Sequence, residues 1–171
     1  MDSGPVISLI APRFNEAGNV EALLDAVSGA IPLAMGIEVL FVDDPTDGTA
    51  EIVEKVAPRY AKTVSVHHRA EPVGGLGGAV VEGIAQTGAL WVMVMDADLE
   101  HPAALIPELM AAGERAAAEM VVASRYAAGG SRRGLAGGYR VVVSGGSTTL
   151  AKGLFPRLPR RVSDPMSGFF G

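Results

Sequence analysis

Short apolar runs alternate with stretches of helical periodicity through the first 123 residues of the chain. The runs are apolar at consecutive positions, which is typical of parallel strands that are buried on both faces. The pattern predicts strands at residues 6–11, 39–42, 64–66, 90–95 and 120–123.

Amphipathic stretches separate these strands. In two of them apolar residues recur at helical spacing: Val20, Leu23, Leu24 and Val27, then Leu105, Ile106, Leu109 and Met110. Thr49 is predicted to cap a helix that carries Val53 and Val56, and residues 77–87 are predicted to form another. The alternation predicts an α/β fold with one open, mostly parallel, Rossmann-like sheet flanked by helices. Further on, residues 126–138 are predicted to form a loop and residues 139–154 a helix.

Composition agrees with a single domain over residues 1–171. Hydrophobic residues make up 49% of the chain and charged residues 19%, so a sizeable core can form. The absence of cysteine excludes disulfides, thiolate zinc sites and a cysteine nucleophile. No apolar run approaches the roughly 18 residues that cross a bilayer, and residues 1–5 do not resemble an export signal. Because no closing element is visible at residues 167–171, we expect the domain to be truncated there.

The net charge of −5 is unevenly distributed. Residues 1–123 contain 6 Lys/Arg and 18 Asp/Glu, a net of −12, whereas residues 124–171 contain 8 Lys/Arg and one Asp, a net of +7. An acidic segment suits a cation and is a poor partner for nucleic acid, and a basic one suits an anionic ligand or lipid head groups.

Polar or glycine-rich residues follow all five predicted strands. Ligands of open parallel sheets bind at the carboxyl ends of the strands, so these segments are candidate sites. They are residues 12–16, 43–48, 72–78, 96–102 and 124–126.

The carboxylates after the fourth predicted strand form the sharpest of these candidates. Asp96 and Asp98 can converge on one cation where the strand ends, and Glu100 extends the series. Carboxylates with open coordination positions suit Mg²⁺ or Mn²⁺ shared with substrate phosphates. His67 and His68 are interpreted as strand-end residues rather than metal ligands.

A dinucleotide-binding site is the main alternative from the residues alone. The segment Gly75-x-Gly77-x-x-Val80 opens a helix after a strand, and Asp96 lies near the spacing of a ribose-binding acid. However, Val80 stands where that fingerprint needs Gly or Ala, and Asp98 would have no role. A phosphate-binding P-loop motif is absent from the sequence.

Six segments in order resemble a family 2 glycosyltransferase of the GT-A fold, specifically the polyprenyl-phosphate (dolichol-phosphate) mannosyltransferases. They are Pro12-Arg-Phe-Asn-Glu16, Val42-Asp-Asp44 with Asp47-Gly-Thr49, Gly75-Leu-Gly77, Asp96-Ala-Asp98-Leu-Glu100-His-Pro102, Ser124-Arg-Tyr126 and Ser167-Gly-Phe169. The chain departs from the family pattern at Arg13, at Pro45-Thr46 and at Glu100, which stands where the family has glutamine.

The resemblance implies roles for particular residues. Those that would surround the nucleotide are Pro12, Phe14, Glu16, Val42 and Asp44. Asp96 and Asp98 would hold the metal against the diphosphate, with Ala97 and Glu100 beside them. Arg125, Arg140 and Ser144 would take the acceptor phosphate. Residues 1–123 would then be the nucleotide-sugar and metal half of the domain, and residues 124–171 the acceptor half.

The expected activity is inverting transfer of a hexose, mannose, from GDP-mannose or a UDP-sugar to a polyprenyl phosphate. The acceptor implies peripheral contact with the cytoplasmic face of a membrane, for which residues 154–161 interleave apolar and basic side chains. Two other functions remain open at this point. One is a nonenzymatic module that binds a nucleotide sugar or lipid head group, and the other is transfer to a sugar hydroxyl with Asp98 as base.

Overall fold

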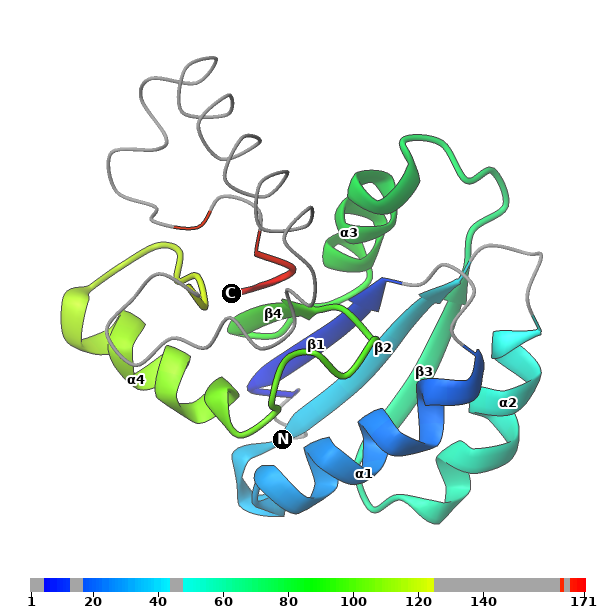
Figure 1. The fold of residues 1–171 in the computed structure, drawn as a ribbon, viewed down its shortest axis with the longest axis horizontal. Coiled ribbons are helices and arrows are strands. Elements are labelled where there is room, and N and C mark those ends of the chain that lie inside the picture. The colour runs from blue at the N-terminus through cyan, green and yellow to red at the C-terminus, as the bar shows by residue number, and fades with distance from the viewer. Residues whose placement is uncertain (1–4, 13–16, 44–47, 125–163, 165–166) are drawn as a thin grey trace, which may run out of the picture.

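In the part of the chain that the structure describes, residues 5–12, 17–43, 48–124, 164 and 167–171, five strands form one sheet flanked by helices (Figure 1). This computed structural model has the strand order β3-β2-β1-β4-β5. The strands are β1 (Ile7–Pro12), β2 (Ile37–Asp43), β3 (Thr63–His68), β4 (Trp91–Met95) and β5 (Phe169–Phe170). The helices are α1 (Val20–Ala30), α2 (Thr49–Val56), α3 (Gly75–Ala85) and α4 (Leu105–Ala116), with short 3₁₀ helices at Ala17–Asn19, Leu33–Met35 and Ala57–Arg59.

The central strand β1 pairs in parallel with both β2 and β4. Its register runs from Ile7↔Ile37 to Pro12↔Val42 on one side and from Ile7↔Trp91 to Ile10↔Val94 on the other. The chain moves outward from β1 through β2 to β3 and then returns to the opposite side of β1. The strand order therefore reverses between β1 and β4, and in open α/β sheets ligands bind at the carboxyl ends of such a pair.

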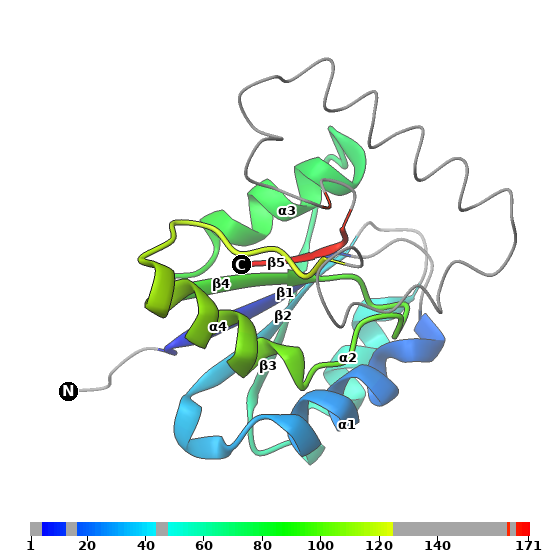
Figure 2. The same ribbon diagram turned by 60° about the vertical axis from the view of Figure 1, so that its left-hand side comes forward.

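Side chains of the central strands pack into two cores. Leu9 and Ala11 belong to the larger core, which includes residues of α1, α2 and α4, whereas Ile10 and Val94 belong to a smaller core that includes Ala79 of α3. Figure 2 shows the same division, with α3 on one side of the sheet and the other three helices on the opposite side. Burial on both faces is why these strands are apolar at consecutive positions.

Helix α3 contacts the strands of the sheet through a glycine. A Cβ atom on Gly83 would lie 2.8 Å from Cγ2 of Ile10 and 3.0 Å from Cγ2 of Val42. Both distances are shorter than a relaxed carbon–carbon contact of about 3.5–4.0 Å. The close approach of α3 therefore depends on Gly83, and it buries the side chain of Val42 completely.

The mostly parallel sheet and the first four strands are confirmed, but the prediction of a fifth strand at residues 120–123 is wrong. That segment makes only an isolated antiparallel bridge, between Val122 and Phe170. The strand beside β4 is instead β5, which runs antiparallel to it with Val94↔Phe170 and Met95↔Phe169. The two phenylalanines take this edge because each adds a large apolar side chain to one of the two cores.

Thr49 was expected to cap helix α2, and this prediction is also wrong. The capping position belongs to Gly48, whose φ of +68° is the left-handed conformation that glycine adopts readily. Thr49 is the first helical residue and its side chain is buried. The predicted loop at residues 126–138 and helix at residues 139–154 lie outside the described residues.

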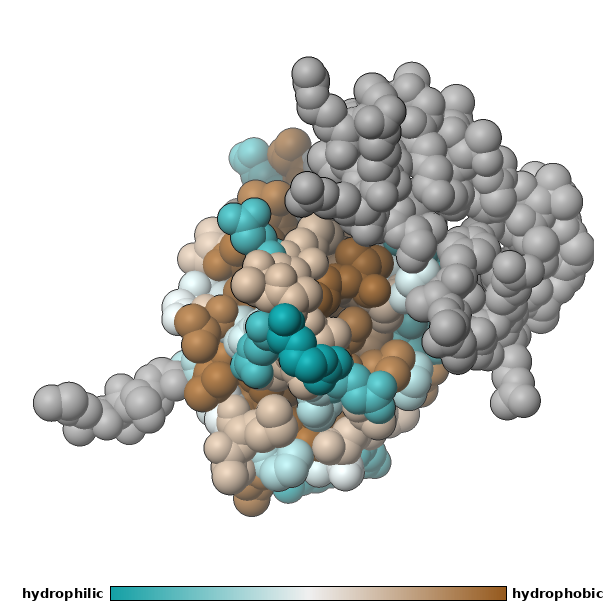
Figure 3. All heavy atoms as spheres, turned by 90° about the vertical axis from the view of Figure 1, so that its left-hand side faces the viewer, coloured by the Kyte–Doolittle hydropathy of each residue, from teal (hydrophilic) through white to brown (hydrophobic). Residues whose placement is uncertain are grey.

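The face shown in Figure 3 carries both hydrophilic and hydrophobic residues. The hydrophilic residues form a band across its middle, and hydrophobic residues lie on either side of this band. In the described ranges, no helix combines the length and the apolar character that a membrane span needs.

Candidate functional site

The candidate residues meet at one edge of the sheet, where β1, β2 and β4 end. Pro12 is the last residue of β1 and pairs with Val42 of β2. Asp96 directly follows β4, whose Val94 pairs with Ile10. Continuing that register by two residues sets Asp96 level with Pro12. The fold thus brings together three segments that the sequence separates widely.

The segment after β4 forms a tight turn that carries both aspartates. Asp96 is half-buried, Ala97 is buried, and Asp98 and Glu100 are exposed. Oδ1 of Asp98 accepts a hydrogen bond from the backbone N–H of Glu100 at 2.9 Å. Leu99, between them, has a φ of +62°, which is uncommon for a residue with a side chain. The local hydrogen bond of Asp98 holds this turn together.

The turn carries two aspartates, and carboxylate oxygens are the ligands that a hard divalent cation prefers. In the described part of the chain, no three or more His, Asp or Glu residues are grouped closely enough to hold a metal. Glu100 therefore does not complete a three-carboxylate cluster with Asp96 and Asp98. Two carboxylates at an open sheet edge are nevertheless the usual protein share of a Mg²⁺ site, where phosphates and water supply the other oxygens.

At the carboxyl ends of β1 and β2, Pro12 and Val42 offer mainly backbone atoms to a ligand. Both side chains are buried, and that of Val42 packs against α3. A ligand at the ends of β1 and β2 would therefore meet their main-chain atoms. Several other predicted site residues lie outside the described residues: Phe14, Glu16, Asp44, Arg125, Arg140 and Ser144.

The two neighbouring histidines end strand β3, as predicted, and each lies near a carboxylate. Nε2 of His67 is 3.5 Å from Oε2 of Glu82, and Nδ1 of His68 is 3.7 Å from Oδ2 of Asp43. Asp43 is almost fully buried at the end of β2. Both histidines therefore lie beside carboxylates at the border of the site.

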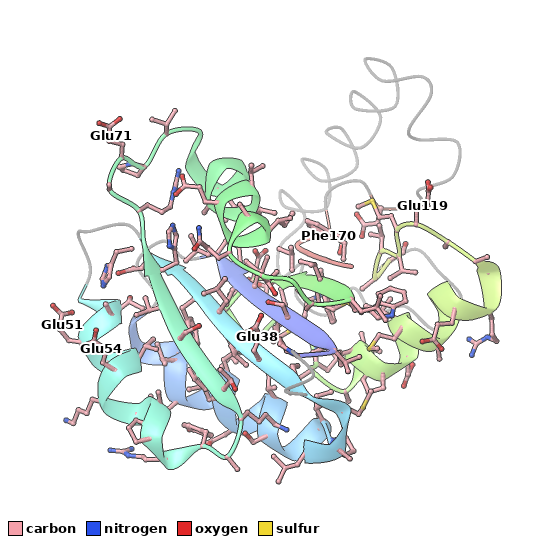
Figure 4. The ribbon with its side chains drawn as sticks, turned by 180° about the vertical axis from the view of Figure 1, so that it is seen from behind. Glu38, Glu51, Glu54, Glu71, Glu119 and Phe170 are labelled. Atoms are coloured by element: carbon pink, nitrogen blue, oxygen red, sulfur yellow. The ribbon has the colours of Figure 1, made fainter. Side chains whose placement is uncertain are left out.

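Arg69, which directly follows β3, was not singled out by the sequence pattern. Its side chain is fully buried, which is rare for arginine unless its donors are satisfied. Nε donates to Oε1 of Glu82 at 2.9 Å, Nη1 donates to the carbonyl of Gly75 at 3.2 Å, and Nη2 donates to the carbonyl of Val73. The loop between β3 and α3 thus folds around one guanidinium group, with Glu71 at its outer tip (Figure 4).

Glycines at the end of this loop and in the first turn of α3 shape the path of the chain. Gly74 and Gly75 have φ values of +79° and +55°. A Cβ atom on Gly78 would overlap the carbonyl oxygen of Val73 and lie 2.8 Å from Nη2 of Arg69. Within the glycine-rich segment that suggested a dinucleotide fingerprint, Gly78 is therefore the position that leaves room for Arg69 and for the carbonyl of Val73.

The ion pair between Arg69 and Glu82 makes the stability of the fold depend on pH. The hydrogen bond from Arg69 holds the pKa of Glu82 below its ordinary value of 4.5, although desolvation acts in the opposite direction. A carboxyl whose pKa is lower in the folded state stabilises the fold above its unfolded pKa and loses that contribution as the pH falls through the folded value.

We expect the urea midpoint of the wild type to fall more, between about pH 7 and about pH 3, than that of Glu82→Gln, which lacks the titrating group. Urea titrations at several pH values measure this difference. An identical acid-induced fall in both proteins would contradict a role for the Glu82 carboxylate.

The segment 167–171 lies on the same edge, directly against the aspartate turn. The backbone N–H of Asp96 donates to the carbonyl of Gly168 at 3.3 Å. The ring of Phe169 is fully buried and its centroid lies 5.5 Å from that of His101. In the sequence, this segment stood out only through the resemblance of Ser167-Gly-Phe169 to the family motif. Its contact with Asp96 could not be predicted from a local pattern, because the two residues lie far apart in the chain.

The family of the chain follows from comparison with known proteins. A family model described as glycosyl transferase family 2 matches residues 8–170. The chain therefore belongs to glycosyltransferase family 2, which confirms the resemblance and favours it over the dinucleotide-binding alternative.

Three curated relatives are dolichol-phosphate mannosyltransferases. The protein from Pyrococcus furiosus is 33% identical over 96% of this chain and 45% of its own length. Those from Mycosarcoma maydis and Saccharomyces cerevisiae are 32% and 33% identical, over 99% and 96% of this chain and 57% and 59% of their own lengths. The chain thus spans about half the length of the relatives it matches.

Solved structures confirm the fold class. Glucosyl-3-phosphoglycerate synthase from Mycobacterium tuberculosis, solved with UDP, superimposes with a TM-score of 0.63 at 23% identity, over 98% of this chain and 56% of that one. The same enzyme solved with Mn²⁺, UDP-glucose and phosphoglyceric acid gives a TM-score of 0.59 at 22% identity, again over 98% of this chain and 56% of the other. The sheet and its helices are therefore those of a GT-A glycosyltransferase.

Proposed function

We propose that the chain forms the catalytic domain, with a donor half and an acceptor half, of an inverting mannosyltransferase that moves mannose from GDP-mannose to a polyprenyl phosphate. The observation that carries the proposal is identity of about one third to three dolichol-phosphate mannosyltransferases over nearly the whole chain. The aspartate turn at the carboxyl end of β4 supports it, because it offers oxygen ligands where an open α/β sheet binds its ligand.

The donor would lie across the ends of β1, β2 and β4. Backbone atoms of Pro12 and Val42 would border the nucleotide, together with Phe14, Glu16 and Asp44. Asp96 and Asp98, next to Ala97, would hold a Mg²⁺ or Mn²⁺ ion at the diphosphate. Such an ion stabilises the negative charge that develops on the departing diphosphate.

The acceptor needs positioning more than deprotonation. A phosphate monoester is largely ionised at neutral pH, since its second pKa is about 6, so one of its oxygens can attack the anomeric carbon without a strong base. The new carbon–oxygen bond forms as the bond to the nucleoside diphosphate breaks on the opposite side, which inverts the configuration. Arg125 and Arg140, with Ser144, would orient the acceptor phosphate, because guanidinium groups bind phosphate through two parallel hydrogen bonds.

The polyprenyl acceptor also implies where the protein works. A lipid-linked phosphate lies at a membrane surface, so residues 124–171, with their net charge of +7, would form the acceptor half and contact anionic head groups. The proposal includes peripheral attachment at the cytoplasmic face, through the apolar and basic residues at 154–161.

Calorimetric titration with GDP-mannose, UDP-glucose and NAD, each with and without Mn²⁺, tests this function. We expect GDP-mannose to bind most tightly and to lose most of its affinity without the metal. If UDP-glucose bound most tightly, the donor would be UDP-glucose and not GDP-mannose. Metal-independent binding of NAD alone would contradict the glycosyltransferase function itself.

A further inference from the structure

The short strand β5 is held on both sides. On one side it pairs with β4, and on the other the carbonyl of Phe169 accepts a hydrogen bond from the N–H of Ala123 at 3.0 Å. Phe169 belongs to the larger core and Phe170 packs against the smaller one, on the α3 side of the sheet (Figure 4). The residues just before β5 are therefore anchored by a strand that cannot shift without disturbing both cores.

The turn before β5 is also fixed locally. Oγ of Ser167 accepts a hydrogen bond from the N–H of Phe169 at 3.2 Å, and the N–H of Ser167 donates to the carbonyl of Asp164 at 3.3 Å. Asp164 is completely buried. Gly168, between Ser167 and Phe169, is thus held on both sides by residues with defined partners.

Gly168 contacts Asp96 in two ways. Its backbone forms a hydrogen bond with Asp96, and the carboxylate of Asp96 lies in the space that a side chain at residue 168 would occupy. Its carbonyl accepts the hydrogen bond from the N–H of Asp96. A Cβ atom on Gly168 would overlap Oδ2 of Asp96 and lie 2.6 Å from its Cγ and 3.2 Å from Oδ1. The φ of Gly168 is not positive, so its backbone would accept any residue. The obstacle to a side chain at this position is the carboxylate of Asp96.

We propose that Gly168 is a positioning residue for Asp96: it leaves open the space that the carboxylate occupies and holds the backbone of Asp96 through its carbonyl. This inference rests on the proposed function, in which Asp96 is a metal ligand. Metal-binding groups must be held within about 0.5 Å of their productive geometry. A methyl group at residue 168 would force the carboxylate to rotate away by more than this.

The test compares two alanine variants of the same segment. Gly168→Ala introduces a methyl group against Asp96. Gly171→Ala introduces one whose nearest neighbours are in Met93 and Val92: it would overlap Sδ of Met93 and lie 3.0 Å from its Cε. Both variants crowd the edge of β4, but only the first reaches the metal ligand. Gly171→Ala is therefore the matched control for general damage to this edge.

Calorimetric titration of Mn²⁺ in the presence of GDP is the first readout. We expect Gly168→Ala to weaken the apparent affinity for Mn²⁺ by about 10- to 100-fold, as loss of groups that orient metal ligands does. Gly171→Ala should retain wild-type affinity even if its urea midpoint falls. Unchanged affinity in Gly168→Ala, or equal weakening in both variants, would overturn the proposal.

The carboxyl carbon of Asp96, observed by NMR without metal, is the second readout. Its chemical shift should move in Gly168→Ala and stay in place in Gly171→Ala. If the wild type binds no Mn²⁺ with GDP but the shift still moves selectively, the proposed function fails while the positioning role stands. If the shift does not move, the positioning role fails whatever the metal does.

A milder variant covers the case in which Gly168→Ala does not fold. Ser167→Ala removes the hydroxyl that holds the turn but introduces no overlap. We expect it to fold and to weaken Mn²⁺ binding several-fold, since the turn then holds Gly168 less firmly. Wild-type affinity in Ser167→Ala, alongside a misfolded Gly168→Ala, would also overturn the proposal.

Discussion

Asp98→Ala should lose nearly all metal-dependent binding of the nucleotide sugar while keeping the stability of the wild type. Asp98 is exposed, and the hydrogen bond that its carboxylate accepts from the N–H of Glu100 closes a local turn, so its removal leaves the core intact. In the proposed site it supplies one of two carboxylates to the metal. Removal of a single group that stabilises transition-state charge, such as an oxyanion-hole donor, lowers turnover by about 100- to 1,000-fold, and we expect a loss of at least that size here.

Titration of GDP-mannose in the presence of Mn²⁺ measures the effect on binding, and release of GDP measures the effect on turnover. Glu119→Gln is a suitable control, because Glu119 is an exposed carboxylate in the turn after α4, away from the aspartate turn (Figure 4). Metal-dependent binding that survives in Asp98→Ala would remove Asp98 from the metal site.

Arg69→Ala should be the most destabilising single change in the loop between β3 and α3. It removes a fully buried guanidinium and leaves the carbonyls of Val73 and Gly75 without their hydrogen bonds from it. Hydrogen bonds from a charged group contribute about 1.5–3 kcal/mol each, and this buried guanidinium donates three, so we expect a loss of about 3 kcal/mol in the free energy of unfolding.

Arg59→Ala is the matched control for this change. Arg59 also pairs with a glutamate, Glu21 at 3.2 Å, but both side chains are more than half exposed. Exposed ion pairs contribute between about 0 and 1 kcal/mol. Urea unfolding of both variants measures the contrast. Similar losses in the two would show that the burial of Arg69 contributes no more than a surface pair does.

Local patterns predicted most of the fold and the centre of the site. The central strands are apolar at consecutive positions because both faces are buried, and α1 and α4 repeat their apolar residues at helical spacing. The aspartates at 96 and 98 were recognised because they directly follow the apolar run that forms β4. All of these signals lie within short stretches of sequence and need no knowledge of distant contacts.

Two features could not be predicted because arginine and threonine do not behave here as they usually do: the burial of Arg69 and the capping of α2. Arginine is normally exposed, so burial of Arg69 could not be expected without knowing that Glu82 and two loop carbonyls would surround it. Thr49 is a common capping residue, yet the left-handed turn at Gly48 gave the capping position to the glycine. The first outcome was decided by the groups that the fold brings around Arg69, and the second by the backbone conformation of Gly48.

The sequence by itself determined the class of fold, and it predicted that a ligand would bind at the carboxyl ends of the strands, beside Asp96 and Asp98. Only the tertiary structure decided which segment lies beside β4, and hence which residue borders Asp96. Segment 120–123 has the apolar pattern of a strand, but Phe169 and Phe170 occupy the edge because together they fill both cores. Pairing between segments so far apart is governed by packing and not by local propensity.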